Sequence, residues 1–238
     1  MRFNPSKCTT MRISRGRNKS HTTYNMMGVT LEKTKESKYL GVYIQNDLRW
    51  NAQVNYARSK ASKVLNFLKR NFHHTSQSTK EKLYKTLVRP HLDYATSAWD
   101  PFTAKNIKDL ERVQNAAARF TTSTYGRDTS VTSLKESLGW LPLQVRRQAN
   151  RLTCLYKILN GTMDIDHRKY ITPKTHGRTR GHDHQFQLNH TRTDVHANSF
   201  FPKTTKEWNN LPSSVISAKT TSAFKAELFI FLKPTSQK

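Results

Sequence analysis

Acidic residues are scarce in this chain of 238 residues. Its 16 Asp and Glu residues oppose 41 Lys and Arg residues, which gives a formal net charge of +25 at pH 7. A surplus of this size makes a folded chain repel itself unless an anionic partner neutralises part of its surface. The imbalance favours nucleic acid as that partner, ahead of an anionic membrane or an acidic protein.

Cysteine and long apolar runs are also scarce. Cys8 and Cys154 are the two cysteines, and two distant thiols form neither a disulfide framework nor a four-ligand zinc site. They suggest a reducing compartment. No run of about 18 apolar residues predicts a membrane span, and the first residues lack the apolar core of a signal peptide. We therefore expect an intracellular protein without a membrane partner.

The chain lacks an obvious carboxylate cluster of the kind with which polymerases and nucleases hold two divalent ions about 4 Å apart. Asp164 and Asp166 lie close together after Gly161, where aspartates usually serve turns. The same region contains His182, Asp183, His184, His190 and His196. We assign no catalytic or metal-binding residue. A small metal-dependent nucleic-acid enzyme using Asp164, Asp166 and these histidines is the alternative hypothesis.

The first 45 residues have the β-branched content of strands. We predict strands at Cys8 to Ile13 and Tyr39 to Ile44, a weaker strand at Met26 to Leu31, and a polar turn from Ser14 to His21. A small hairpin-like sheet is the simplest assembly of these segments.

Helical periodicity replaces the strand pattern from residue 46. Asn46 is the predicted N-cap of a long amphipathic helix, and Ser78 with Glu81 forms a predicted capping box for the next one. Pro90 is expected to kink or end that second helix. Three more helices are predicted over about residues 103–120, 131–138 and 142–160, with Gly139 and Gly161 as stops.

Four regions result, and the predicted fold class is α+β, mostly α. Residues 1–45 form strands, and residues 46–160 form a helical bundle. Residues 161–198 are a basic, histidine-rich loop without periodicity, with a short strand at Phe186 to Leu188. Residues 199–238 form a tail that closes with a helix carrying Phe224, Leu228, Phe231 and Leu232.

Basic side chains lie on the faces of the predicted helices opposite the apolar stripes. A multi-helix surface of this kind can follow a phosphate backbone without reading its sequence. The predicted phosphate contacts are Arg58, Lys63, Arg112, Arg119, Arg146, Arg147 and Arg151, and the loop adds Arg178, Arg180 and Arg192. Within helices, Asp93 and Glu111 are predicted ion-pair partners of Arg89 and Arg112.

Several segments in succession resemble the reverse transcriptases of non-LTR retrotransposons, the jockey-like LINE elements. "FNPSKCTTMRIS" from Phe3 is similar to the strand after the active-site turn, and "KYLGVYIQNDLRW" from Lys38 to the hairpin between palm and thumb. Thumb and tail segments then follow in the family's order: "LVRPHLDYATSAWDP", "LERVQNAAARF", "LGWLPLQVRRQANRL" and "FFPKTTKEWNNLP". The resemblance covers nearly the whole chain.

The resemblance implies a palm-remnant sheet, a helical thumb and a basic C-terminal extension that grip an RNA–DNA template–primer. Tyr39, Leu40 and Gly41 would approach the primer side with their backbone. RNA, RNA–DNA hybrid or DNA would be the ligand, and the missing upstream polymerase half the protein partner. Because the family acts at chromosomal DNA, the resemblance implies that the protein is located in the nucleus, the cytoplasm or both.

The chain departs from the family's pattern at the catalytic centre. The Tyr/Phe-x-Asp-Asp turn would lie just upstream of Phe3 and is absent, so no catalytic residue carries over. Mg²⁺ is accordingly expected for the complete polymerase and not for this chain. Gln53 stands where the family has a histidine. A truncated product without a function of its own is the further alternative.

Overall fold

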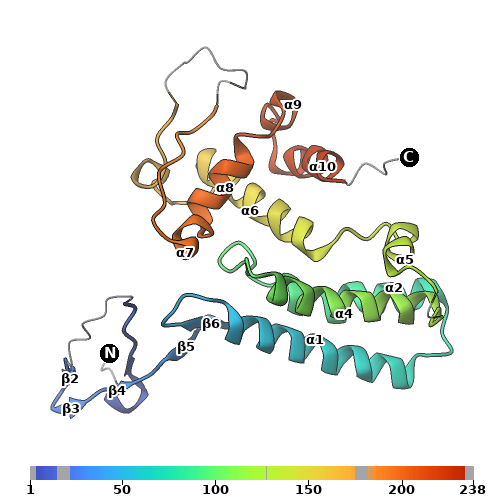
Figure 1. The fold of residues 1–238 in the computed structure, drawn as a ribbon, viewed down its shortest axis with the longest axis horizontal. Helices are drawn as coiled ribbons and strands as arrows, with labels where there is room; N and C mark the ends of the chain where they lie inside the picture. The colour runs from blue at the N-terminus through green and yellow to red at the C-terminus, as the bar shows by residue number, and fades with distance from the viewer. Residues whose placement is uncertain (1–3, 15–21, 127, 175–181, 183, 234–238) are drawn as a thin grey trace.

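The computed structural model describes residues 4–14, 22–126, 128–174, 182 and 184–233. Helices predominate and the strands are short, so the predicted α+β, mostly α class is confirmed (Figure 1). Most of the predicted turn after Ser14, the loop residues Arg178 and Arg180, and Asp183 lie outside the described residues.

Three two-stranded sheets follow the 3₁₀ turn Pro5–Lys7. β1 (Thr9–Thr10) pairs in parallel with β4 (Glu32–Lys33). Two antiparallel hairpins join β2 (Asn25–Met26) to β3 (Val29–Thr30), and β5 (Glu36–Tyr39) to β6 (Val42–Gln45). The predicted strand at Cys8 to Ile13 is therefore reduced to two residues, and the single small sheet is three separate pairs.

Two segments predicted as single strands are hairpins. The turn at Met27 and Gly28 has φ values of 50° and 78°, and the turn at Leu40 and Gly41 has values of 44° and 84°. Two successive positive φ values define the tight turn whose twist suits a hairpin. The prediction was wrong here because Met and Leu, in place of the usual Asn or Asp, occupy the first turn position.

The first core is built around two long helices, α1 (Asn51–Asn71) and α4 (Ala104–Thr122), which run side by side in Figure 1. Their apolar stripes face each other and continue onto the segment between them. The buried members include Val54, Leu65, Leu68, Tyr84, Val88, Leu92, Trp99, Leu110, Ala117 and Phe120. The predicted three- and four-residue spacing is thus confirmed as core packing.

α1 begins later than predicted, because Asn46 belongs to a turn and not to the helix. Leu48 has φ 54°, and Trp50 occupies the N-cap position. The first turn of α1 is instead held by glutamines. The Oε1 of Gln45 accepts a hydrogen bond from the Ala52 amide at 2.8 Å, and the Oε1 of Gln53 accepts one from the Tyr43 amide at 2.9 Å. These two bonds fix β6 against the start of α1.

α2 (Gln77–Leu83) begins two residues earlier than the predicted capping box. Ser76 is the N-cap, and its hydroxyl accepts a hydrogen bond from the Thr79 amide at 3.2 Å. Glu81 does not reach back to the helix start. Its carboxylate instead contacts Lys85 and the indole Nε1 of Trp140, at 2.5 and 3.1 Å.

Replacing Ser76 with Ala should lower the free energy of unfolding by about 1 kcal/mol, because an amide of the first turn loses its acceptor. Urea unfolding followed by circular dichroism measures the change. Ser78→Ala is the matched control and should stay within about 0.5 kcal/mol of wild type, since Ser78 is an exposed residue inside the helix. An equal loss in both variants would contradict the assignment of Ser76 as the cap.

Pro90 neither ends the helix nor leaves it regular. A π-helical turn (Tyr84–Val88) precedes it, and α3 (Arg89–Asp93) continues through it. The Arg89 amide bonds the carbonyl of Tyr84, five residues back. Proline lacks an amide hydrogen and its ring clashes with the carbonyl four residues earlier, so a wider turn relieves both problems.

α5 (Val131–Ser137) and α6 (Leu143–Leu159) agree with prediction, and the two glycines that follow them have φ values of 64° and 68°. The start of α6 has no side-chain cap of its own. Glu111 of α4 supplies one, because its Oε2 accepts a hydrogen bond from the Leu143 amide at 2.9 Å.

The C-terminal part packs a second core on the other side of α6. It contains the 3₁₀ turn His167–Lys169 and the helices α7 (Asp194–Ala197), α8 (Phe200–Trp208), α9 (Ser213–Ile216) and α10 (Thr221–Phe231). Buried side chains of this core include Leu152, Leu155, Tyr156, Trp208, Phe224 and Leu228. The two cores meet within α6, before the predicted end of the helical bundle at residue 160.

The region from 161 to 198 is more structured than a plain loop, yet the predicted strand at Phe186 to Leu188 is wrong. Phe186 makes one isolated antiparallel bridge with Pro173. The Nδ2 and Oδ1 of Asn209 bond the carbonyl and amide of Phe186, at 2.8 and 3.0 Å. The amides of Lys174 and Gln187 also donate to the carbonyls of Gln185 and Thr172, both at 2.9 Å, so the strand-like pairing is limited to this one bridge. Within the described residues, no helix is long and apolar enough to cross a membrane.

Candidate nucleic-acid interface

A groove between α1 and α4 brings together cations predicted to contact phosphate. Arg58 and Lys63 come from α1 and Arg112 from α4, and Lys69 lies with them. The groove has a volume of about 420 Å³ and also exposes Ser59, Ser62 and Asn66. Ammonium, guanidinium, hydroxyl and amide groups are all donors that protein surfaces use toward phosphate oxygens.

The charge of the groove is strongly one-sided. α1 has five cationic side chains (Arg58, Lys60, Lys63, Lys69 and Arg70) and no carboxylate over its 21 residues. Of the groove's lining residues, Asp109 carries the negative charge, and its buried carboxylate already accepts Arg112 at 2.6 Å and Lys105 at 3.3 Å. The Arg112 side chain stays 71% exposed, so its remaining donors face outward.

Lys69 is the cation that sequence analysis left out of the predicted contacts, although it lies on the basic face of the helix. Burial lowers the pKa of its ammonium group. It forms no ion pair with any residue that the structure describes. A partly desolvated, unpaired ammonium is stabilised by an anion in the groove.

The turn predicted to face the primer side lies beside the start of α1. The hydroxyl of Tyr94 donates a hydrogen bond to the Leu40 carbonyl at 3.0 Å. A Cβ atom on Gly41 would come within 3.2 Å of the Tyr94 ring, so glycine serves both the positive φ and the close packing. Tyr39 and Leu40 themselves are exposed.

A small basic and aromatic cluster adjoins this turn. The Nζ of Lys38 donates to the hydroxyl of Tyr56 at 3.0 Å, and the Nζ of Lys60 lies 5.2 Å from the Tyr56 ring centre. The hydrogen bonds from Lys38 and Lys60 lower the pKa of the Tyr56 phenol. The cluster extends the basic surface of α1 toward the hairpin.

Arg119 and Arg146 use their guanidinium groups within the fold. Arg119 donates to the carbonyls of Gly126 and Thr129 at 3.1 and 3.4 Å, which holds the loop after α4. Arg146 donates twice to the carboxylate of Asp93, at 3.1 and 2.6 Å. Both guanidinium groups, predicted to contact phosphate, therefore already have hydrogen-bond partners within the described chain.

The ion pairs predicted for two helical carboxylates had different outcomes. Asp93 does pair with Arg89, at 3.8 Å, as well as with Arg146. Glu111 does not pair with Arg112. Its partner is Lys135 of α5, at 2.7 Å, and Arg112 pairs with Asp109 three residues earlier.

Arg147 and Arg151 are buried, and the prediction that they project from the surface of the fifth helix is wrong. Their exposed fractions are 1% and 3%. Both donate to the carboxylate of Asp100, Arg147 through Nε at 2.7 Å, and Arg151 also donates to Glu207 at 2.6 Å. Lys203 of α8 donates to Asp100 as well. We call these five side chains the Asp100 cluster.

The residues of the alternative enzymatic hypothesis do not converge in the described part of the chain. Asp166 caps the turn His167–Lys169 and pairs with Arg168 at 3.0 Å, and Asp164 is exposed. The Nε2 of His182 lies 3.3 Å from the Trp208 carbonyl. No group of three His, Cys, Asp or Glu side chains suited to a metal occurs among the described residues.

Comparisons with known proteins add no family to this geometry. No family model, curated protein or solved structure matches the chain. The resemblance to non-LTR reverse transcriptases stays a prediction that depends on the segments quoted above.

Proposed function

We propose that the chain binds the sugar–phosphate backbone of a nucleic acid along the groove between α1 and α4. The observation that carries the proposal is the convergence of Arg58, Lys63, Lys69 and Arg112 in one groove. These residues come from two helices that are separated by 32 residues in sequence, and three of them have no carboxylate partner in the described chain.

The dimensions of α1 suit this role. Arg58 and Lys69 are 11 residues apart, which corresponds to roughly 16 Å along a helix axis. One strand of a duplex advances about 3.4 Å per phosphate, so this row faces about five phosphates. Binding would release counterions from the nucleic acid and would therefore weaken as salt rises. Uncharged donors such as Ser62 and Asn66 would fix the register without reading bases.

We further propose that this binding serves a reverse transcriptase of the non-LTR type, in which the helical region acts as the thumb. The quoted sequence segments and the helical bundle after the β5–β6 hairpin support this assignment. The turn at Leu40 and Gly41 would then lie toward the primer. The chain would hold an RNA–DNA template–primer, and the chemistry with its Mg²⁺ would belong to the upstream half.

Fluorescence anisotropy of the purified chain with labelled RNA–DNA hybrid, duplex DNA and single-stranded RNA, over a salt series, tests both proposals. Salt-steep binding that favours the hybrid is the expected result. Heparin serves as a polyanion of unrelated shape. Weak binding that is equal for all four ligands would contradict the thumb assignment, and no binding at all would contradict the groove as well.

A further inference from the structure

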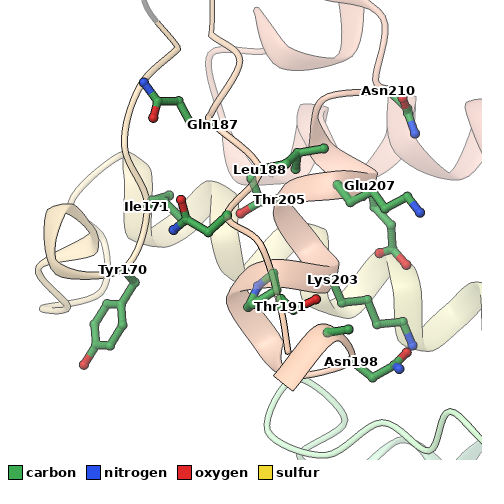
Figure 2. A pocket seen from close by; sticks show the side chains of 14 residues that line it. Tyr170, Ile171, Gln187, Leu188, Thr191, Asn198, Lys203, Thr205, Glu207 and Asn210 are labelled. Carbon is green, nitrogen blue, oxygen red and sulfur yellow. The ribbon is translucent and has the colours of Figure 1, made fainter. Parts of the chain in front are cut away.

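An open pocket of about 520 Å³ lies in the C-terminal part, where the segment 187–191 crosses α8 (Figure 2). Its walls come from this segment, from the end of α7, from α8 and from Tyr170 at the edge. α8 packs against α6, which in turn packs against α4 (Figure 1). A volume of this size suits a small organic ligand.

The pocket is rich in neutral hydrogen-bonding groups that the fold does not use. The side chains of Gln187, Asn189, Thr191 and Asn210 form no hydrogen bond within the described chain. Thr205 is 2% exposed, and its Oγ1 also has no partner there. A buried polar atom without a partner is unfavourable, so this hydroxyl lowers the stability of the pocket wall.

Among the described residues that line the pocket, Lys206 is the cation that has no carboxylate partner. Lys203 donates to Asp100, and Glu207 accepts from Arg151, so both are neutralised inside the fold. Lys206 is exposed and forms no ion pair among the described residues. A site for a divalent metal would need several free carboxylate or imidazole ligands, and the lining does not provide them.

The pocket also has an aromatic ring at its edge. Tyr170 stacks on Phe201 with ring centres 4.4 Å apart and an angle of 6° between the planes. This contact packs one side of the ring, and the Tyr170 side chain as a whole stays largely exposed. Proteins that bind single strands use such rings to stack bases, and they use amide side chains to bond base edges.

We infer that this pocket holds one unpaired nucleotide of a single-stranded nucleic acid. The amides of Gln187 and Asn189 would bond the base edge, Tyr170 would stack the base or its neighbour, and Lys206 would contact the phosphate. The site is separate from the groove between α1 and α4, and its occupation does not require the groove to bind.

An NMR titration of the full chain with AMP, GMP, CMP and UMP tests the inference, because a mononucleotide carries a single phosphate and cannot span the groove. Saturable shifts in residues 187–210 are expected, with a Kd of about 1 mM or below for at least one base. The double variant Gln187→Ala, Asn189→Ala should bind about tenfold more weakly, since two hydrogen bonds are lost. Ala197→Phe, which fills the pocket from α7, should abolish the shifts.

The controls separate this site from the groove. The variant Arg58→Gln, Lys69→Gln should bind mononucleotides as wild type does, even if its affinity for long nucleic acids falls. Inorganic phosphate and ribose are titrated in parallel, and circular dichroism melts verify that each variant folds. Absence of mononucleotide shifts, unchanged binding in the pocket variants, or equal binding of phosphate or ribose alone would each overturn the inference.

Discussion

Asp100→Asn should lower the free energy of unfolding by about 3–5 kcal/mol, the usual loss when a buried ion pair loses one partner. Asp100 is 7% exposed and accepts hydrogen bonds from Arg147, Arg151 and Lys203. Asparagine retains the shape but not the charge, so the buried guanidinium of Arg147 would lose the carboxylate to which it donates, and Arg151 would keep Glu207 alone. Urea unfolding followed by circular dichroism measures the change. Asp164→Asn, at an exposed carboxylate, is the matched control and should have little effect.

The pH dependence of the free energy of unfolding, compared between wild type and Asp100→Asn, gives an independent check. Burial alone would raise the pKa of Asp100, but the charges of Arg151, Lys203 and Arg147 outweigh it and the pKa is lowered. Around pH 4 the unfolded chain therefore binds more protons at this site than the folded chain. The free energy of unfolding consequently decreases as the pH is lowered. Wild type should lose the contribution of Asp100 below about pH 4, its unfolded pKa. The difference from Asp100→Asn should shrink there, and a constant difference from pH 7 to pH 3 would contradict this role.

Replacing Arg58, Lys63, Lys69 and Arg112 together with Gln should flatten the salt dependence of nucleic-acid binding. Each phosphate contact contributes about 0.9 to the slope of log K against log salt, so the slope should become shallower by roughly 3–4. Glutamine keeps much of the side-chain length and removes the charge. Anisotropy titrations with RNA–DNA hybrid from 50 to about 200 mM salt measure both slope and affinity.

A control of equal charge change distinguishes a local interface from overall attraction. Lys169, Lys219, Lys225 and Lys233 are exposed and lie outside the groove, in the C-terminal part. Their combined replacement with Gln changes the net charge by the same amount. It should alter the slope by less than about one unit. Equal effects of the two quadruple variants would show that net charge, and not the groove, binds the nucleic acid.

Local rules predicted the helical part well wherever neighbouring residues decide the outcome. The helix predicted over about residues 103–120 is α4, whose buried face includes Leu110, Val113 and Ala117. Gly139 and Gly161 predicted the ends of α5 and α6. These features follow from helix geometry and from the ease with which glycine takes a positive φ. The N-cap residues of the helices were less predictable. Ser76 and Ser78 are equally suitable residue types, and in the structure Ser76 is the N-cap.

The prediction of single strands at the two hairpins was wrong for a related reason. Leu40 adopts a positive φ that a leucine rarely takes, and its carbonyl is held by the hydroxyl of Tyr94, 54 residues later. A contact over that distance is invisible to a local pattern. The same holds for Glu111, whose partners Lys135 and Leu143 lie on other helices.

The sequence by itself determined the basic character of this protein, its mostly helical class and the faces on which its cations lie, because composition and helical period are local properties. The tertiary structure decided which of those cations are available. Arg58 and Arg151 look alike in sequence, each on a helix beside an apolar stripe. Packing left Arg58 in an open groove, and it buried Arg151 against a carboxylate 51 residues away. A buried guanidinium needs that carboxylate for compensation, and only the folded chain brings the two together.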